Sequence, residues 1–228
     1  MMSEAVKDVL RIVASSLQVP TIVILLLLIL ATVILIGAFA AEFLTERRAL
    51  KTDIPKLIDE MQGKSSAQLE KVIAESGLLK RQKAACEKLI QRIKYPDNTR
   101  EALARQLIAD EETRYLKKTK VTDIIARVAP MFGLMGTLIP LGPGLIALAQ
   151  GDTKTLSDSL LIAFDTTVAG LISAAVAYVI SGIRKGWYEK YMTGLETVME
   201  TILEEQVRIR ARAFAALQSQ EEKEGAIQ

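Results

Sequence analysis

Two apolar segments separated by a short polar stretch constrain this chain more than any other feature. Residues 124–149 and 160–180 are rich in aliphatic and small side chains. Each segment is long enough to cross a bilayer core of about 30 Å. A soluble domain could bury one such segment, but two in succession predict a transmembrane hairpin.

A third apolar segment, residues 19–44, precedes this hairpin. Half of the residues in the chain are hydrophobic and 25% are charged, and the charged residues collect outside the three apolar segments. This segregation is typical of membrane proteins with a cytoplasmic part. We therefore expect an all-α integral membrane protein with three transmembrane helices and long helices that extend into the cytoplasm.

The distribution of lysine and arginine predicts the orientation. Basic residues cluster after the first span, before the second and after the third, whereas the hairpin turn has only Lys154 beside Asp152 and Asp158. Because basic loops stay inside, the N-terminus and the turn should lie outside the cell (inner) membrane and the C-terminus in the cytoplasm. The expected order is an amphipathic helix over 1–18, spans over 19–44, 123–150 and 159–184, a cytoplasmic helical segment over 45–122, an extracytoplasmic turn over 151–158 and a cytoplasmic helical tail over 185–228.

The segments outside the spans carry helical patterns. Ser65 and Gln68 have the spacing of a capping box, and Asn98 and Glu101 form a second such pair after a break at 95–99. The first 18 residues fit either a helix on the membrane surface or a solvated extension of the first span; their apolar stripe is Val6, Leu10, Val13 and Leu17. The tail has a stripe for contact with neighbouring subunits or with the middle segment: Tyr191, Leu195, Val198, Ile202 and, after a break at Glu205, Ile209.

Prolines and small residues give the hairpin its character. Pro140 and Pro143 remove backbone donors, so we expect the helix to be interrupted there, under the cover of protein or a water-filled cavity. Rows of small residues four apart let helices pack closely. The second and third spans should therefore be interior, with the first span shielding them from lipid.

Polar residues at membrane depth are the candidate functional residues. A charge such as that of Asp165 costs about 3 kcal/mol at the bilayer centre, and no cation lies at matching depth. Asp165 should thus face water, a bound cation or another subunit, or be protonated; it either belongs to an ion path or makes a packing hydrogen bond. Thr137, Thr166 and Thr167 either bond to their own helix or line a hydrated path.

Two motifs in the hairpin resemble a known family. The second span contains Ala129-Pro130-Met-Phe-Gly133-Leu134-Met-Gly136-Thr137, and the third contains Thr167-Val-Ala-Gly170-Leu171. Together with the order of the spans, these motifs resemble the MotA/TolQ/ExbB proton-channel family, and the TolQ/ExbB branch most closely.

The resemblance implies a homo-oligomeric ring, a homopentamer, that forms a pore around two copies of a single-span ExbD/TolR-like membrane partner. A partner aspartate would carry the ion, proton or sodium, beside Thr137 and Thr167, and the ion gradient would drive mechanical work at the cell envelope. Residues expected to pack around the pore are Pro130, Gly133, Gly136, Pro140, Pro143, Gly170 and Ala174. Asp165 is an addition to the family pattern, which suggests a sodium site formed by Asp165, Thr166 and Thr167.

Other functions have less support. The chain has no histidine, which excludes histidine catalysis and histidine metal ligands, and it shows no nucleotide-binding loop or metal-ligand spacing. We therefore expect no enzyme activity, no cofactor and no resident metal, and a net charge of +2 gives no reason to expect nucleic-acid binding. Cys86 should be a buried, inert thiol. The alternatives are a structural or regulatory membrane scaffold and half of a small-solute transporter.

Overall fold

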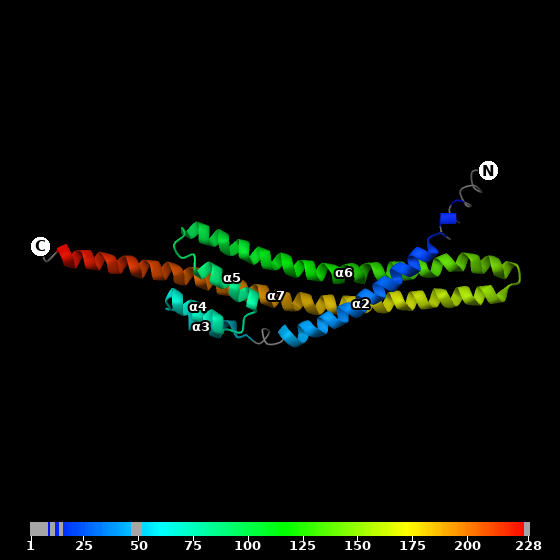
Figure 1. Cartoon of the computed structure of the whole chain (residues 1–228), viewed down its shortest axis with the longest axis horizontal. Coiled ribbons are helices and arrows are strands. Elements are labelled where there is room, and N and C mark those ends of the chain that lie inside the picture. The colour runs from blue at the N-terminus through cyan, green and yellow to red at the C-terminus, as the bar shows by residue number, and fades with distance from the viewer. Residues whose placement is uncertain (1–8, 10–11, 14–15, 47–51, 226–228) are drawn as a thin grey trace. The chain divides into compact units, whose positions relative to one another are not determined.

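The structure is a computed structural model that describes residues 9, 12, 13, 16–46 and 52–225. All regular elements within these residues are helices (Figure 1). Three of them are long and apolar enough to cross a membrane, which confirms the prediction of an all-α chain with three candidate spans. The helices are α2 (Gln18–Glu46), α3 (Ile54–Met61), α4 (Ser66–Glu75), α5 (Lys80–Ile90), α6 (Asp97–Ala149) and α7 (Thr153–Gly225). The amphipathic helix expected over 1–18 falls largely outside the described residues, Val6 and Leu10 included.

The chain divides into two compact units. The first, here called the span unit, comprises residues 1–41 and 117–185, and the second, the core unit, comprises residues 42–116 and 186–228. Helices α6 and α7 each contribute to both units without a break. The predictions that a helix continues directly into the second span, and that the third span continues into the tail, are confirmed.

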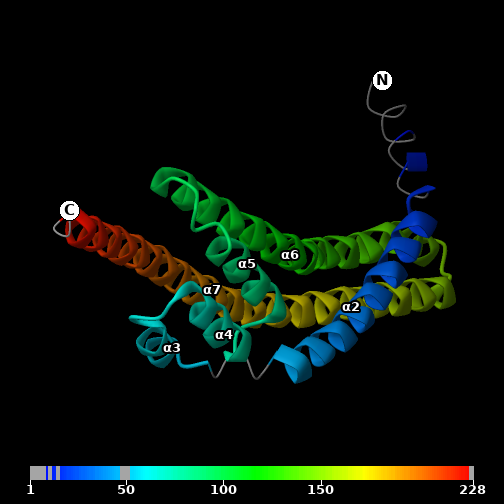
Figure 2. The same cartoon turned by 60° about the vertical axis from the view of Figure 1, so that its left-hand side comes forward.

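The core unit is built around one buried apolar cluster to which α3, α4, α5, α6 and α7 all contribute (Figure 2). The cluster includes Leu195, Val198 and Ile202 of the tail stripe, and Ile209 packs against it, whereas Tyr191 belongs to a separate cluster of tyrosines. The middle segment of the same chain is therefore one partner of the stripe. Members with 0% exposure include Met61, Leu69, Ile73, Cys86, Leu89, Leu195, Val198 and Ile202.

The helix ends in the core unit are set by specific hydrogen bonds. Gln68 Oε1 accepts from the backbone N–H of Ser65 at 2.9 Å, as the capping-box spacing predicts. The second predicted pair is wrong, because α6 begins at Asp97 and Asn98 lies within its first turn. The carbonyl of Pro96 already accepts from Arg100 N at 3.0 Å, so helical bonding starts before Asn98.

Glu205, where the predicted apolar stripe of the tail is interrupted, is buried within the continuous helix α7. Its Oε2 accepts from the backbone N–H of Gly63 at 3.0 Å, and its Oε1 pairs with Arg208 at 2.6 Å. Gly63, in the turn between α3 and α4, has φ +72°, a value that favours glycine. The helix continues through Glu205 because its carboxylate is neutralised and hydrogen-bonded where it is buried.

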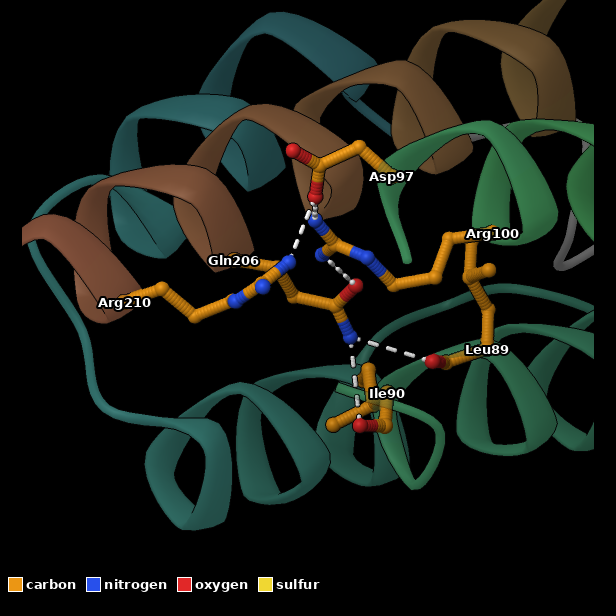
Figure 3. A network of polar contacts seen from close by, with 6 residues as sticks. All are labelled: Leu89, Ile90, Asp97, Arg100, Gln206 and Arg210. Atoms are coloured by element: carbon orange, nitrogen blue, oxygen red, sulfur yellow. Dashed lines mark hydrogen bonds and ion pairs between the residues drawn. The ribbon is translucent and has the colours of Figure 1, made fainter. Parts of the chain in front are cut away.

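A polar network joins α5, α6 and α7 (Figure 3). Arg100, which is 1% exposed, donates to Gln206 Oε1 at 2.6 Å. Gln206 Nε2 then donates to the carbonyls of Leu89 at 3.0 Å and Ile90 at 3.1 Å, at the end of α5. One side chain of α7 thus satisfies backbone groups that the end of a helix leaves without partners.

Asp97 completes this network at the surface. It pairs with Arg100 and, at 2.6 Å, with Arg210. The hydrogen bond from Arg100 holds the pKa of the Asp97 carboxyl below its ordinary value of 3.8. The start of α6 is therefore fastened to α7 by the ion pair between Asp97 and Arg210 and by the hydrogen bond from Arg100 to Gln206.

In the span unit, α2 packs on the hairpin through one side only. Its Leu28, Ala31 and Leu35 contact a small buried cluster, whose members are Ile125, Ala129, Ala174 and Ala177. Most other large side chains of α2 are exposed, including Leu26, Leu27 and Leu30. This is the arrangement of a helix that covers one side of a hairpin and presents its remaining surface to lipid.

The expected interruption of the second span is absent. Helix α6 runs unbroken from Asp97 to Ala149 with Pro130, Pro140 and Pro143 inside it. A proline removes one backbone donor and crowds the carbonyl four residues earlier, and in a packed membrane helix small adjustments accommodate this. For Pro140 the earlier residue is Gly136, which has no side chain to add to the crowding.

Candidate functional site

The hairpin turn sets the register between α6 and α7. Helix α6 ends at Ala149 and α7 begins at Thr153, so most of the turn expected over 151–158 is already helix. Gly151 has φ +81°, and Asp152 Oδ1 accepts from Thr155 N at 3.1 Å, which caps α7. The bonds from Thr155 hold the pKa of the Asp152 carboxyl below its ordinary value. This short connection makes the two helices antiparallel neighbours.

Glycines bring the two helices into backbone contact. A Cβ atom on Gly170 would lie 2.7 Å from the carbonyl oxygen of Ala129 and 2.9 Å from Cα of Gly133. A Cβ on Gly136 would lie 2.6 Å from Cβ of Thr166. These three glycines, predicted as packing residues, therefore have no room for a side chain.

The other predicted packing residues differ in their surroundings. Ala174 is buried against α2 and α6, and Pro140 is buried in the hairpin, whereas Pro130 is half-buried and Pro143 is exposed. Gly144, which was not singled out, also lies in the contact, since its Cβ would be 3.0 Å from Cβ of Ser159. The contact thus extends along the full apolar length of α6.

Thr166 faces the partner helix in this contact. It is 8% exposed, and its hydroxyl lies 2.9 Å from the carbonyl oxygen of Ile162 and 3.0 Å from that of Ala163. The hydroxyl is thus bonded to its own helix, and the Cβ and Oγ1 atoms of Thr166 occupy the space over Gly136.

Asp165 and Thr167 lie on different sides of α7. Residues two positions apart in sequence, as these are, are separated by about 200° around a helix. Asp165 is exposed, whereas Thr167 is half-buried and its hydroxyl has no hydrogen-bond partner within the described residues. The structure therefore does not bring Asp165, Thr166 and Thr167 together as ligands of one ion within a single chain.

Thr137, on α6, is half-buried. Its hydroxyl donates to the carbonyl of Leu134 at 2.7 Å. The role of the four polar residues in ion transport stays a prediction. Among them, Asp165 and Thr167 are the two whose side-chain polar groups have no hydrogen-bond partner within the described residues.

Sequence reasoning missed a polar cluster at the other end of the hairpin. Asp123 accepts from Ser181 and pairs with Lys185, whose Nζ lies 2.8 Å from its Oδ2. Beside it, Arg184 donates to Thr122 Oγ1 at 3.3 Å. Asp123 and Ser181 are equally far from the turn in sequence, so pairing residues about the turn would have found them. This cluster fastens α6 to α7 where the apolar stretch ends.

Comparison with known proteins agrees with the helix order and the packed hairpin. A family model described as the MotA/TolQ/ExbB proton channel family matches residues 65–197, which is more than half of the chain. The chain belongs to the MotA/TolQ/ExbB proton channel family. Comparison with curated protein sequences finds no significant match.

Membership in the MotA/TolQ/ExbB family places the site in context. The matched region begins at the N-terminus of α4 and includes both apolar segments of the hairpin, with Thr137, Asp165 and Thr167. The chain is therefore a membrane subunit of proton-channel type, and the hairpin of α6 and α7 is its candidate functional site.

Proposed function

We propose that this chain is the ring-forming subunit of an ion-driven motor of the TolQ/ExbB type. The observation that carries the proposal is the family match over the hairpin, whose small and hydroxyl-bearing residues sit at membrane depth. Backbone contact at Gly133 and Gly170 makes each hairpin a narrow, firm wall element. Several such elements side by side form a pore wall that fits closely around another helix.

The proposed assembly is a homopentamer in the cell (inner) membrane around two single-span partners of ExbD/TolR type. The N-terminus and the turn at Gly151 lie outside, and the end of α7 lies in the cytoplasm, since basic residues flank the spans on that side. A proton or sodium ion moves between partner and ring and drives mechanical work at the cell envelope. The reaction is transport without covalent catalysis, and it requires no cofactor.

Thr137 and Thr167 are the proposed ring ligands beside the ion. Thr167 is favoured because its hydroxyl is covered and still lacks a hydrogen-bond partner among the described residues. Asp165 lies on another side of α7 and so acts at a different contact, where its charge raises affinity for a cation.

Ion flux into vesicles tests this function. The chain and a co-expressed single-span partner are reconstituted, and proton uptake is followed with a pH-sensitive dye. Thr137→Val and Thr167→Val keep the side-chain volume but remove a ligand worth about 1–1.5 kcal/mol, so flux should fall about tenfold. Asp165→Asn should change the response of flux to sodium.

Thr32→Val in α2 is the matched control. Thr32 is buried and, like that of Thr137, its hydroxyl bonds to its own helix, at 2.8 Å from the carbonyl oxygen of Leu28. Flux through the control should be unchanged. Equal flux in all three valine variants, with assembly intact, would contradict an ion path along Thr137 and Thr167 and favour a scaffold.

A further inference from the structure

A groove on the core unit has no occupant within the described residues. It has a volume of about 370 Å³ and lies between α6 and α7, with Ile108, Met199 and Leu203 among the residues that line it. Its other lining residues include Glu101, Glu200 and Glu204. The groove thus combines an apolar floor with an acidic rim.

The rim carries excess negative charge. Glu101 pairs with Arg105 at 3.1 Å, which neutralises one carboxylate. Glu200 and Glu204 are exposed and have no ion pair in the described part of the chain. They are four residues apart, so their side chains are about one helical turn apart on the same side of α7.

The outer side of α5 and of the turn after it carries the opposite charge. Between residues 80 and 94 the chain has six lysines and arginines and a single acid, Glu87. Lys88 and Arg92 are exposed and also four residues apart. Their spacing along the chain matches that of Glu200 and Glu204.

The two surfaces lie on different sides of the core unit. Ile202 of α7 points into the apolar cluster formed with α5, and Glu200 and Glu204 are two residues away from it, about 160–200° around the helix. Lys88, on α5, and Arg92, in the turn after it, are both exposed to solvent. The acidic groove and the basic surface of one chain therefore face away from each other.

Both surfaces lie at the same level along α7. Gln206 donates to the carbonyl of Leu89, so the residue after Lys88 lies beside the residue two positions after Glu204 (Figure 3). A second copy, rotated about an axis along the helices, can place its basic surface on this groove without sliding lengthwise. Contacts of this head-to-tail kind form a ring when the rotation between neighbouring copies closes, as the proposed pentamer requires.

We infer that the acidic groove between α6 and α7 binds the basic side of α5 of a second copy of this chain. This inference deepens the proposed ring and rests on it. The aliphatic stems of Lys88 and Arg92 cover Leu203 and Ile108, and their charged ends pair with Glu204 and Glu200. The contact names the two surfaces through which neighbouring subunits recognise each other outside the membrane.

Cysteine cross-linking of the full chain in mild detergent tests the inference. The native Cys86 does not interfere, because burial raises the pKa of its thiol to about 12 and keeps it unreactive. A chain carrying both Lys88→Cys and Glu204→Cys should form a ladder of disulfide-linked dimers, trimers and larger species. Each single variant alone should stay monomeric under denaturing conditions, and a mixture of the two should stop at dimers.

The matched control uses Lys71→Cys in place of Lys88→Cys. Lys71 is an exposed lysine on α4. Together with Glu204→Cys it should give no ladder. Disulfide dimers of Lys88→Cys alone would show a symmetric contact and overturn the inference. An oligomer seen by native mass spectrometry without a ladder would also overturn it.

Charge exchange gives a second test that does not depend on disulfides. Glu200→Lys with Glu204→Lys, or Lys88→Glu with Arg92→Glu, should weaken the oligomer, and the chain with all four changes should recover it. Failure of recovery contradicts the inference. Because these tests need neither partner nor ion flux, a failure of the proposed motor function is distinguished from a failure of this contact.

Discussion

Glycines decide how closely the two long helices approach. At Gly170 the neighbouring atoms are backbone atoms, Ala129 O and Gly133 Cα, which cannot rotate away as a side chain can. Any added carbon therefore forces the helices apart along a contact that includes Thr166. Gly182, further along α7, has nothing within 4 Å of its Cβ position.

Gly170→Ala should destabilise the span unit by about 1–3 kcal/mol, the usual cost of overpacking. Gly182→Ala should be neutral or stabilising by about 0.5–1 kcal/mol, because alanine is the better helix former. Unfolding in mixed detergent, followed by circular dichroism, measures both. Equal unfolding midpoints for the two variants would show that the helices separate freely at Gly170.

The sequence located the polar residues of the site better than it oriented them. Apolar segment length places Thr137, Asp165, Thr166 and Thr167 at membrane depth. Consecutive residues on a helix point about 100° apart, so they cannot all face one path. Which of these side chains faces the other helix of the hairpin depends on the glycine contacts. Those contacts follow from packing, which a single sequence does not display.

At the scale of helices, the core unit is held together by α7. Its apolar side contributes to the buried cluster, while Glu205 and Gln206 satisfy backbone groups of the α3–α4 turn and of α5. Arg100 joins α6 to the same region. Buried polar groups of this kind stabilise a structure only while every partner is present.

Arg100→Leu should therefore lower the free energy of unfolding by about 1.5–3 kcal/mol, since Gln206 and Asp97 lose a charged hydrogen-bond donor. Arg105→Leu, at an exposed ion pair, should change it by less than about 1 kcal/mol. Denaturant titration of both variants measures the difference. A loss as large for Arg105→Leu would mean that the buried network has no special role.

The same network has a pH dependence of known sign. The folded pKa of Asp97 lies below its unfolded value of 3.8, so its pairing with Arg100 stabilises the fold above that value. The stabilisation is lost as the pH falls through the lowered pKa. The Arg100→Leu variant should show a smaller acid-dependent component, because only the pair of Asp97 with Arg210 then remains.

Helix type and extent were predictable because the apolar period is long and regular. The prediction of an interruption at Pro140 and Pro143 was wrong, because the effect of a proline on a helix depends on the residues around it. In α6, a glycine lies four residues before Pro140. Helices α6 and α7 also begin earlier than the polar stretches suggest, because Asp97 is the first residue of α6 and Asp152 caps the start of α7.

At the scale of the molecule, the three apolar helices identify the chain as a membrane protein. Its proposed orientation can be tested directly. Ser157→Cys lies near the exposed hairpin turn, and Lys71→Cys lies on α4. In intact membrane vesicles of known sidedness, a membrane-impermeant thiol reagent should label the two from opposite sides. Labelling of both from one side would contradict the proposed orientation, which places α4 in the cytoplasm and the turn outside.

The two long helices differ in their proline content. Three prolines lie within α6, whereas the 73 residues of α7, about 110 Å of helix, contain none. Sharp bends in helices occur mostly at proline, at glycine–serine pairs and at local bulges. Helix α6 therefore has three proline positions at which it can bend, whereas α7 has the Ser181-Gly182 pair and no proline.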